Sequence, residues 1–219
     1  STLCRLCNGL LKPASGKVTT NGLDTRTAKA SLLARGAGFL FQNPDRQICR
    51  NTVREEIMFG LEYTVKSEAE RERRCDDMLS LFSLDGAADP FSMSRGERQK
   101  TALASVLARR PPLLILDEPT TGLDYRECMT IMEAISALHR GGAAVFMITH
   151  DMEVAADFAE RALVLNRGRL AADGPIRTIM KDKAVMDAAS LLPAQIPALA
   201  TALGLDGVFT LDEMYRAAL

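Results

Sequence analysis

The stretch Leu113-Leu114-Ile115-Leu116-Asp117-Glu118-Pro119 joins four apolar residues to two carboxylates and a proline. No polar residue alternates with the four apolar ones, which is typical of a strand that is buried on both faces. Pro111-Pro112, directly before the run, ends a helix predicted from Ser94 to Arg110. The stretch therefore predicts a central strand that delivers Asp117 and Glu118 to one edge of a sheet.

Helices and strands alternate on both sides of this stretch. A helical face is followed by Gly141-Gly142 and then by a second apolar run, Ala143 to Ile148, which we expect to be another buried strand. Such alternation favours an α/β fold with an open parallel sheet, whose ligand binds at the carboxyl ends of the strands. The other predicted elements are a helix at Leu3–Leu11, an extended piece at Val18–Thr20 with an Asn21-Gly22 turn, an amphipathic helix at Ser67–Leu84 followed by Gly86 as its C-cap, paired strands at Ala162–Leu165 and Arg169–Ala172, and a helical tail that contains a Thr210-x-x-Glu213 capping box.

Composition excludes several classes of protein. The 219 residues carry 27 Lys and Arg against 28 Asp and Glu, so the near-neutral chain is a poor match for nucleic acid. No apolar run approaches the ~18 residues of a membrane-spanning helix, so any membrane role must depend on a partner. Five cysteines, an odd number, and no leading signal segment favour a reducing cytosol. Cys4 and Cys7 form a CxxC, but no second pair completes a zinc site, and we interpret both as helical core residues.

Three short segments carry candidate chemistry. Asp117 and Glu118 suit a hydrated hard cation and an activated water, although two acids after a strand could equally cap a helix. Thr149-His150 follows the second apolar run to the same sheet edge, where His150 is a site residue or a buried structural histidine. Ser94-x-x-Glu97 is a capping box, and the same helix start could bind a phosphate.

Taken in order along the chain, these segments and two more resemble the ATP-binding-cassette (ABC) ATPases. The resemblance covers nearly the whole chain and implies a P-loop NTPase-type core with a helical subdomain. Phe41-Gln42-Asn43-Pro44-Asp45 and the helical tail further resemble the ATPase subunits of energy-coupling-factor transporters, the type that takes up vitamins and cobalt or nickel. The matching motifs are a Q-loop at Phe41–Gln47, a signature at Met93–Gln99, a Walker B strand at Leu113–Pro119, a D-loop at Thr121–Asp124 and an H-loop at Thr149-His150.

The resemblance implies a role for each residue of an ATP and Mg²⁺ site. Ser1-Thr2-Leu3 resembles the end of the phosphate loop, G-x-x-x-x-G-K-[ST], so Ser1 would ligate the metal and Thr2 would line the nucleotide. Asp117 would hold Mg²⁺ through water, and Gln42 would reach both the metal and the attacking water. Glu118 would polarise that water, and His150 would stabilise the γ-phosphate.

Two features set this sequence apart from the family pattern. The upstream strand and the glycines and lysine of the phosphate loop are absent from the printed sequence, so we expect this chain alone to bind ATP poorly, although a longer protein need not. The signature departs from Leu-Ser-Gly-Gly-Gln at Met93, Arg95 and Glu97.

In this family two cassettes sandwich two nucleotides head to tail. Ser94 and Gly96 would therefore serve the partner's ATP, and Asp124 would cross the interface. The expected partners are a second ABC ATPase subunit, identical or different, and a transmembrane coupling protein, with no nucleic acid.

The function predicted from this resemblance is ATP hydrolysis that energises an importer of a vitamin or metal ion at the cytoplasmic face of the membrane. We expect an ATPase domain over residues 1–180, with its helical subdomain at about 43–110, and a helical tail over 181–219. Two alternatives are a non-hydrolysing regulatory cassette without the phosphate loop, and a soluble ABC ATPase that acts on nucleic acid or ribosomes. The second is weakened by the short segment between Gln42 and Ser94.

Overall fold

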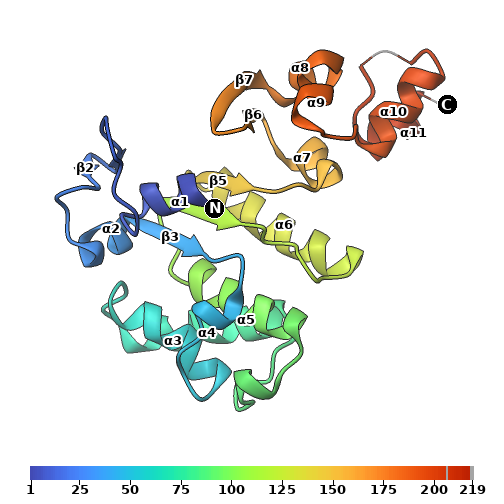
Figure 1. Cartoon of the computed structure of the whole chain (residues 1–219). Helices are drawn as coiled ribbons and strands as arrows, with labels where there is room; N and C mark the ends of the chain where they lie inside the picture. The colour runs from blue at the N-terminus through green and yellow to red at the C-terminus, as the bar shows by residue number, and fades with distance from the viewer. Residues whose placement is uncertain (206, 218–219) are drawn as a thin grey trace. The chain divides into compact units, whose positions relative to one another are not determined.

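The computed structural model describes residues 1–205 and 207–217. By their internal contacts these residues form two compact units, Ser1–Ile148 and a second unit that begins at Thr149. Each unit is described by itself. Most of their helices and strands are labelled in Figure 1.

A parallel sheet in the order β3-β4-β5 is the centre of the first unit. Its strands are β3 (Ala37–Leu40), β4 (Leu113–Asp117) and β5 (Ala144–Ile148). The prediction that the run at 113–116 is the central strand is confirmed, and residues 114–117 of β4 are buried. The strand at 144–148 also forms, but its residues are half-buried or exposed, so the prediction of a second buried strand is wrong. As the edge of the three-stranded sheet, β5 is flanked by a strand on one side only.

A group of helices follows β3 along the chain (Figure 1). It consists of α3 (Val53–Glu62), α4 (Glu68–Leu81) and α5 (Arg95–Leu107). The amphipathic pattern correctly predicts α4, but its C-cap is Phe82, followed by Ser83 in the left-handed region, and not Gly86. The long buried face of α5 packs against α3 and β3. Helix α6 (Tyr125–Arg140) then connects β4 to β5, and its observed bounds contain the predicted apolar face.

The first residues of the unit form α1 (Thr2–Cys7). This helix is shorter than predicted, because Gly9 takes φ +77° and turns the chain back before Leu10 and Leu11. A Cβ at position 9 would lie 2.6 Å from Leu33 Cδ1, so this turn has space only for glycine, which has no side chain. Cys4 is fully buried against Ala37 and Ile115, which agrees with its interpretation as a core residue.

The predicted Asn21-Gly22 turn joins two short antiparallel strands. These are β1 (Thr19–Thr20) and β2 (Leu23–Asp24), and both turn residues have positive φ, the geometry that favours Asn-Gly. Helix α2 (Ala30–Gly36) leads from the hairpin to β3.

The second unit pairs a hairpin with short helices. The hairpin is β6 (Arg161–Asn166) and β7 (Arg169–Pro175), as predicted, with the turn at Arg167-Gly168. Its small core includes Ala194 and Phe209. The predicted capping box is present, since Thr210 N–H donates to Glu213 Oε2 at 3.2 Å and Glu213 N–H donates to Thr210 Oγ1 at 3.3 Å. The helices are α7 (Met152–Phe158), α8 (Ile176–Lys181), α9 (Lys183–Ala189), α10 (Gln195–Ala202) and α11 (Leu211–Ala217).

In the described part of the chain, no helix combines the length and the apolar character that crossing a membrane requires. The predicted boundary between the ATPase domain and the helical tail, at residue 180, differs from the boundary between the two compact units, at residues 148 and 149. The predicted domains stay a prediction.

Candidate functional site

Asp117 and Glu118 stand where β4 ends. Asp117 is 3% exposed, and its Oδ1 accepts no hydrogen bond from the described residues. The amino nitrogen of Ser1 lies 3.8 Å from this oxygen, so the start of α1 and the end of β4 meet here. Glu118 has φ +55°, a strained conformation for a residue with a side chain, and its N–H donates to Ile148 O at 2.9 Å. The backbone at Glu118 is therefore hydrogen-bonded to the end of the neighbouring strand β5.

The surroundings of Asp117 fit a hard divalent cation. A buried carboxylate oxygen without a hydrogen-bond donor is costly unless a cation or water occupies the space beside it. The described residues contain no group of three or more His, Cys, Asp and Glu that could hold a metal ion. A cation here would need hydroxyl, amide, water or phosphate oxygens to complete its shell, and the predicted set of Ser1, Gln42 and Asp117 leaves room for these, as Mg²⁺ prefers.

The negative charge of Asp117 also affects Cys4. Burial, with a further contribution from Asp117, raises the pKa of the Cys4 thiol to about 12. The Cys4 thiol is therefore neutral, and it is part of the apolar cluster with Ala37 and Ile115.

Gln42 follows β3 and is exposed. Because β3 and β4 are parallel, with Leu40 opposite Leu116, Gln42 leaves the sheet at the edge where Asp117 lies. The segment that follows Gln42 is bound to the signature helix α5 by two side-chain interactions. Gln47 Nε2 donates to Ala102 O at 2.8 Å, and Arg98 pairs with Asp45 at 2.8 Å. Sequence reasoning missed Gln47, since nothing in the sequence pairs it with a helix so far along the chain.

The signature and the D-loop of this chain contact one another. A Cβ on Gly96 would lie 3.2 Å from the Gly122 carbonyl oxygen, so these two backbones approach closely. Ser94 and Asp124 are each the exposed N-cap of the helix that follows, α5 and α6. The structure thus gathers Ser94, Gly96 and Asp124 on neighbouring helix starts.

The sequence of the Ser94 segment is compatible with a capping box, a phosphate-binding helix start, or both. The structure confirms the capping box. Ser94 N–H donates to Glu97 Oε2 at 2.9 Å, and Glu97 N–H donates to Ser94 Oγ at 3.3 Å. The Ser94 hydroxyl also donates to Glu97 Oε2, at 2.6 Å. These bonds lower the pKa of the Glu97 carboxyl, so it is anionic at neutral pH.

Thr2 and His150 complete the predicted set. Thr2 is the first residue of α1, directly after Ser1. His150 is exposed and lies at the start of the second unit, beside Thr149, whose Oγ1 accepts from Asp151 N at 2.9 Å. Since the two units are not placed relative to one another, the role of His150 at the γ-phosphate stays a prediction.

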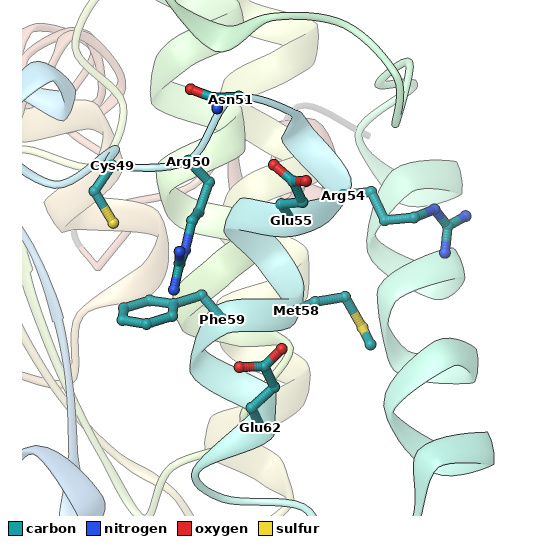
Figure 2. Close-up of a pocket in the computed structure, with 8 residues that line it drawn as sticks. All are labelled: Cys49, Arg50, Asn51, Arg54, Glu55, Met58, Phe59 and Glu62. Atoms are coloured by element: carbon teal, nitrogen blue, oxygen red, sulfur yellow. The ribbon is translucent and has the colours of Figure 1, made fainter.

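A groove of about 610 Å³ opens beside α3 (Figure 2). The Arg50 guanidinium lies over the Phe59 ring, 4.2 Å from its centroid. Buried Glu56 holds the groove's entrance loop by accepting from the backbone N–H groups of Cys49 and Arg50, at 2.9 and 3.0 Å. The sequence does not single out the residues that line this groove, although Thr52 and Glu55 have the spacing of a capping box at the start of α3. The groove is lined by Cys49, Arg50, Asn51, Arg54, Glu55, Met58, Phe59 and Glu62.

Comparison with known proteins gives consistent matches. The sequence profile of the ABC transporter family matches residues 1–121. A putative ABC transporter ATP-binding protein of Caldanaerobacter subterraneus is 39% identical over 206 residues, which are 93% of this chain and 36% of that protein. The energy-coupling factor transporter ATP-binding protein EcfA of Syntrophomonas wolfei is 38% identical over 212 residues, 95% of this chain and 77% of that protein. The chain spans about a third of the length of the Caldanaerobacter relative and of two relatives from Methanosarcina.

Solved structures agree with these relatives. The structure of cbiO1 from Clostridium perfringens, described as part of the ABC transporter complex cbiONQ, has a TM-score of 0.70 at 26% identity, over 93% of this chain and 82% of that one. An ATP-binding cassette solved as a dimer in a post-hydrolysis state, bound to ADP and Pi, has a TM-score of 0.72 at 27% identity, over 80% of this chain and 79% of that one. Both likenesses confirm the predicted α/β class. The chain therefore belongs to the ABC transporter family and has the fold of its ATP-binding cassettes.

Proposed function

We propose that this chain is the ATP-binding and ATP-hydrolysing cassette of an energy-coupling-factor importer for a vitamin or metal ion. The observation that carries the proposal is the buried Asp117 side chain, whose Oδ1 accepts no hydrogen bond from the described residues and lies 3.8 Å from the Ser1 nitrogen, with Glu118 next in the chain. The relative EcfA and the neighbour cbiO1 support the importer class.

In the proposed reaction, ATP is the substrate and each residue has a separate task. Ser1, Gln42 and Asp117 would hold Mg²⁺, which would supply positive charge to neutralise the phosphates of the bound ATP. Glu118 accepts a hydrogen bond from the attacking water and orients it toward the γ-phosphorus.

Other residues of the chain bind the nucleotide. Thr2 contributes to the phosphate-binding helix start, and His150 stabilises negative charge on the γ-phosphate. The ATPase domain extends over residues 1–180, with the helical subdomain at about 43–110.

We propose two protein partners. A second cassette binds against the surface of Ser94, Gly96 and Asp124, so that this surface closes on the partner's ATP. A transmembrane coupling protein docks in the groove between Arg50 and Met58, which belongs to the same connection as Gln42, from β3 into α3. This docking brings the chain to the cytoplasmic face of the membrane. The tail over 181–219 is an accessory helical segment.

The hydrolytic part is tested with Glu118→Gln in the full-length protein that carries this segment. Loss of a catalytic base typically costs roughly 10²- to 10⁴-fold in rate, whereas ATP binding should persist. Glu133→Gln, an exposed site on α6, is the matched control and should hydrolyse ATP at the wild-type rate. Equal rates for E118Q and wild type would reject Glu118 as the base, and no ATP binding by wild type would favour the regulatory alternative.

The docking part is tested through Cys49, which is exposed and lines the groove. Exposed Cys49 should be alkylated at a measurable rate in the purified full-length protein, and this rate should fall several-fold in the complex with the membrane protein. Unchanged alkylation in an intact complex would reject this groove as the docking surface.

A further inference from the structure

The Ser94 hydroxyl has one hydrogen, and it is already donated within the chain. It goes to Glu97 Oε2 at 2.6 Å, the short distance expected when a hydroxyl binds a carboxylate. The same carboxylate oxygen accepts the Ser94 N–H at 2.9 Å. Glu97 therefore binds two donors at the start of α5.

Another capping box of the chain is arranged differently. At the start of α3, Thr52 N–H donates to Glu55 Oε2 and Glu55 N–H donates to Thr52 Oγ1, both at 3.2 Å. Only backbone donors make those two bonds. The capping of a helix thus does not require the hydroxyl hydrogen that Ser94 gives to Glu97.

This arrangement opposes phosphate binding in two ways. A phosphate can accept a hydrogen bond from Ser94 only after the hydroxyl leaves Glu97. The ionised carboxylate also adds a negative charge close to the place where phosphate would lie, and a neutral residue would not.

We propose that Glu97 is a positioning residue that holds the Ser94 hydroxyl and thereby weakens nucleotide binding at the signature surface of this chain. The inference rests on the proposed function, in which that surface closes on the partner's ATP. Closure must break the Ser94–Glu97 bond, so the nucleotide site that this signature completes closes at a higher ATP concentration than one with a neutral residue at position 97. In a dimer of two different cassettes, the two sites would be unequal for this reason.

The test is ATP-dependent dimerisation of the full-length protein, with its natural cassette partner if the two differ. All variants carry Glu118→Gln, which blocks hydrolysis and keeps the closed dimer, and sedimentation gives the ATP concentration at half-maximal dimer. Adding Glu97→Gln should lower this concentration about 3- to 10-fold, since an amide keeps the cap but replaces the charge-assisted bond with a weaker neutral one.

Glu70→Gln is the matched control. Glu70 also occupies the third position of a helix capped by a serine, Ser67, but its carboxylate pairs with Arg73 and Arg74 on α4. This variant should leave the half-maximal ATP concentration unchanged. Thermal unfolding of E97Q, compared with its parent, checks that the helix start remains folded.

Ser94→Ala separates the hydroxyl from the charge. Without the hydroxyl there is nothing for Glu97 to hold, so the gain from E97Q should be smaller in the S94A background, where only the part due to the removed charge remains. If E97Q lowers the half-maximal ATP concentration equally with Ser94 present and in the S94A background, the proposal is overturned, because charge repulsion alone would then explain the effect. No gain from E97Q in a parent that does dimerise would overturn the proposal but not the function, and a parent that fails to dimerise at any ATP concentration would overturn both.

Discussion

The Gln99 side chain binds the backbone of Glu118. Gln99, on α5, is 1% exposed, and its Nε2 donates to the carbonyl oxygens of Glu118 and Pro119 at 3.3 and 3.2 Å. Five residues earlier on the same chain, Ser94 begins α5. The signature helix is thus hydrogen-bonded to the peptide that carries the proposed catalytic carboxylate, so a displacement of α5 reaches Glu118 directly.

Gln99→Leu should impair both folding and hydrolysis. The change leaves two carbonyl groups without their donor inside the protein, which costs about 1–3 kcal/mol of unfolding free energy. It also frees the strained Glu118 backbone, so kcat of ATP hydrolysis should fall while KM for ATP changes less. Ser105→Ala on the same helix removes a buried hydroxyl that donates to Ala102 O and should lower stability without this fall in kcat. A wild-type kcat for Q99L would refute the coupling.

Close packing of β3 against α5 makes Gly38 intolerant of any side chain. A Cβ at this position would lie 2.7 Å from both Pro111 Cγ and Val106 Cγ1. Gly38→Ala should therefore destabilise the first unit by roughly 1–3 kcal/mol, measured by urea denaturation. Gly174→Ala, where a Cβ meets no atom within 4 Å, is the control and should change stability little. Equal stability of G38A and wild type would contradict the packing.

The sequence was most informative where one signal repeats over many residues. The central strand at 113–117 and the helix after it were predicted because apolar runs and helical spacing are local properties. By contrast, β3 was missed, since its four residues contain Gly38 and show no alternation. Helix α3 was missed as well, although the Thr52–Glu55 capping box marked its start.

The same distinction holds for the candidate site. The family resemblance assigns Ser1 and Asp117 to one metal site, and the Ser1 nitrogen lies 3.8 Å from Asp117 Oδ1, while their roles stay a prediction. The bonds of Gln47 and Gln99 did not, because each joins a side chain to a backbone carbonyl of a different element, and no sequence periodicity encodes such a pair. These bonds form because the packing of α5 in the folded protein brings the two partners of each bond together.

The cysteines should differ sharply in reactivity. Cys4 and Cys75 are fully buried, and burial raises the pKa of their thiols to about 12 and about 11, so almost no thiolate is present at pH 7.5. Burial and Glu56 also raise the pKa of the Cys49 thiol, but Cys49 is exposed and should be alkylated before Cys4 and Cys75. Mass spectrometry after iodoacetamide treatment of the native full-length protein measures the order, with urea-unfolded protein as the control in which all three react. Alkylation of Cys4 at the rate of Cys49 in the native protein would contradict the burial.

The second unit should lose stability in acid through Glu213. Its carboxylate binds Arg177 at 2.6 Å and accepts from the N–H groups of Phe209 and Thr210, and the Arg177 bond is the largest cause that lowers the Glu213 pKa to about 2. A carboxyl whose pKa is lowered by folding stabilises the folded state above its unfolded pKa, about 4.5. That contribution is lost as the pH falls from about 4.5 toward 2.

Amide hydrogen exchange of Phe209 and Thr210 between pH 6 and pH 2.5 would measure this loss, after correction for intrinsic exchange at each pH. Wild type should show a drop in protection below about pH 4.5, where the Glu213 carboxyl binds a proton in the unfolded state but not yet in the folded one. Glu213→Gln should start with lower protection and lack the drop, because an amide does not titrate. Arg177→Met should lose most of the drop as well, since the guanidinium is the main cause of the lowered pKa. The same pH profile in wild type and E213Q would mean that this ion pair, which joins α8 to α11, does not stabilise the second unit.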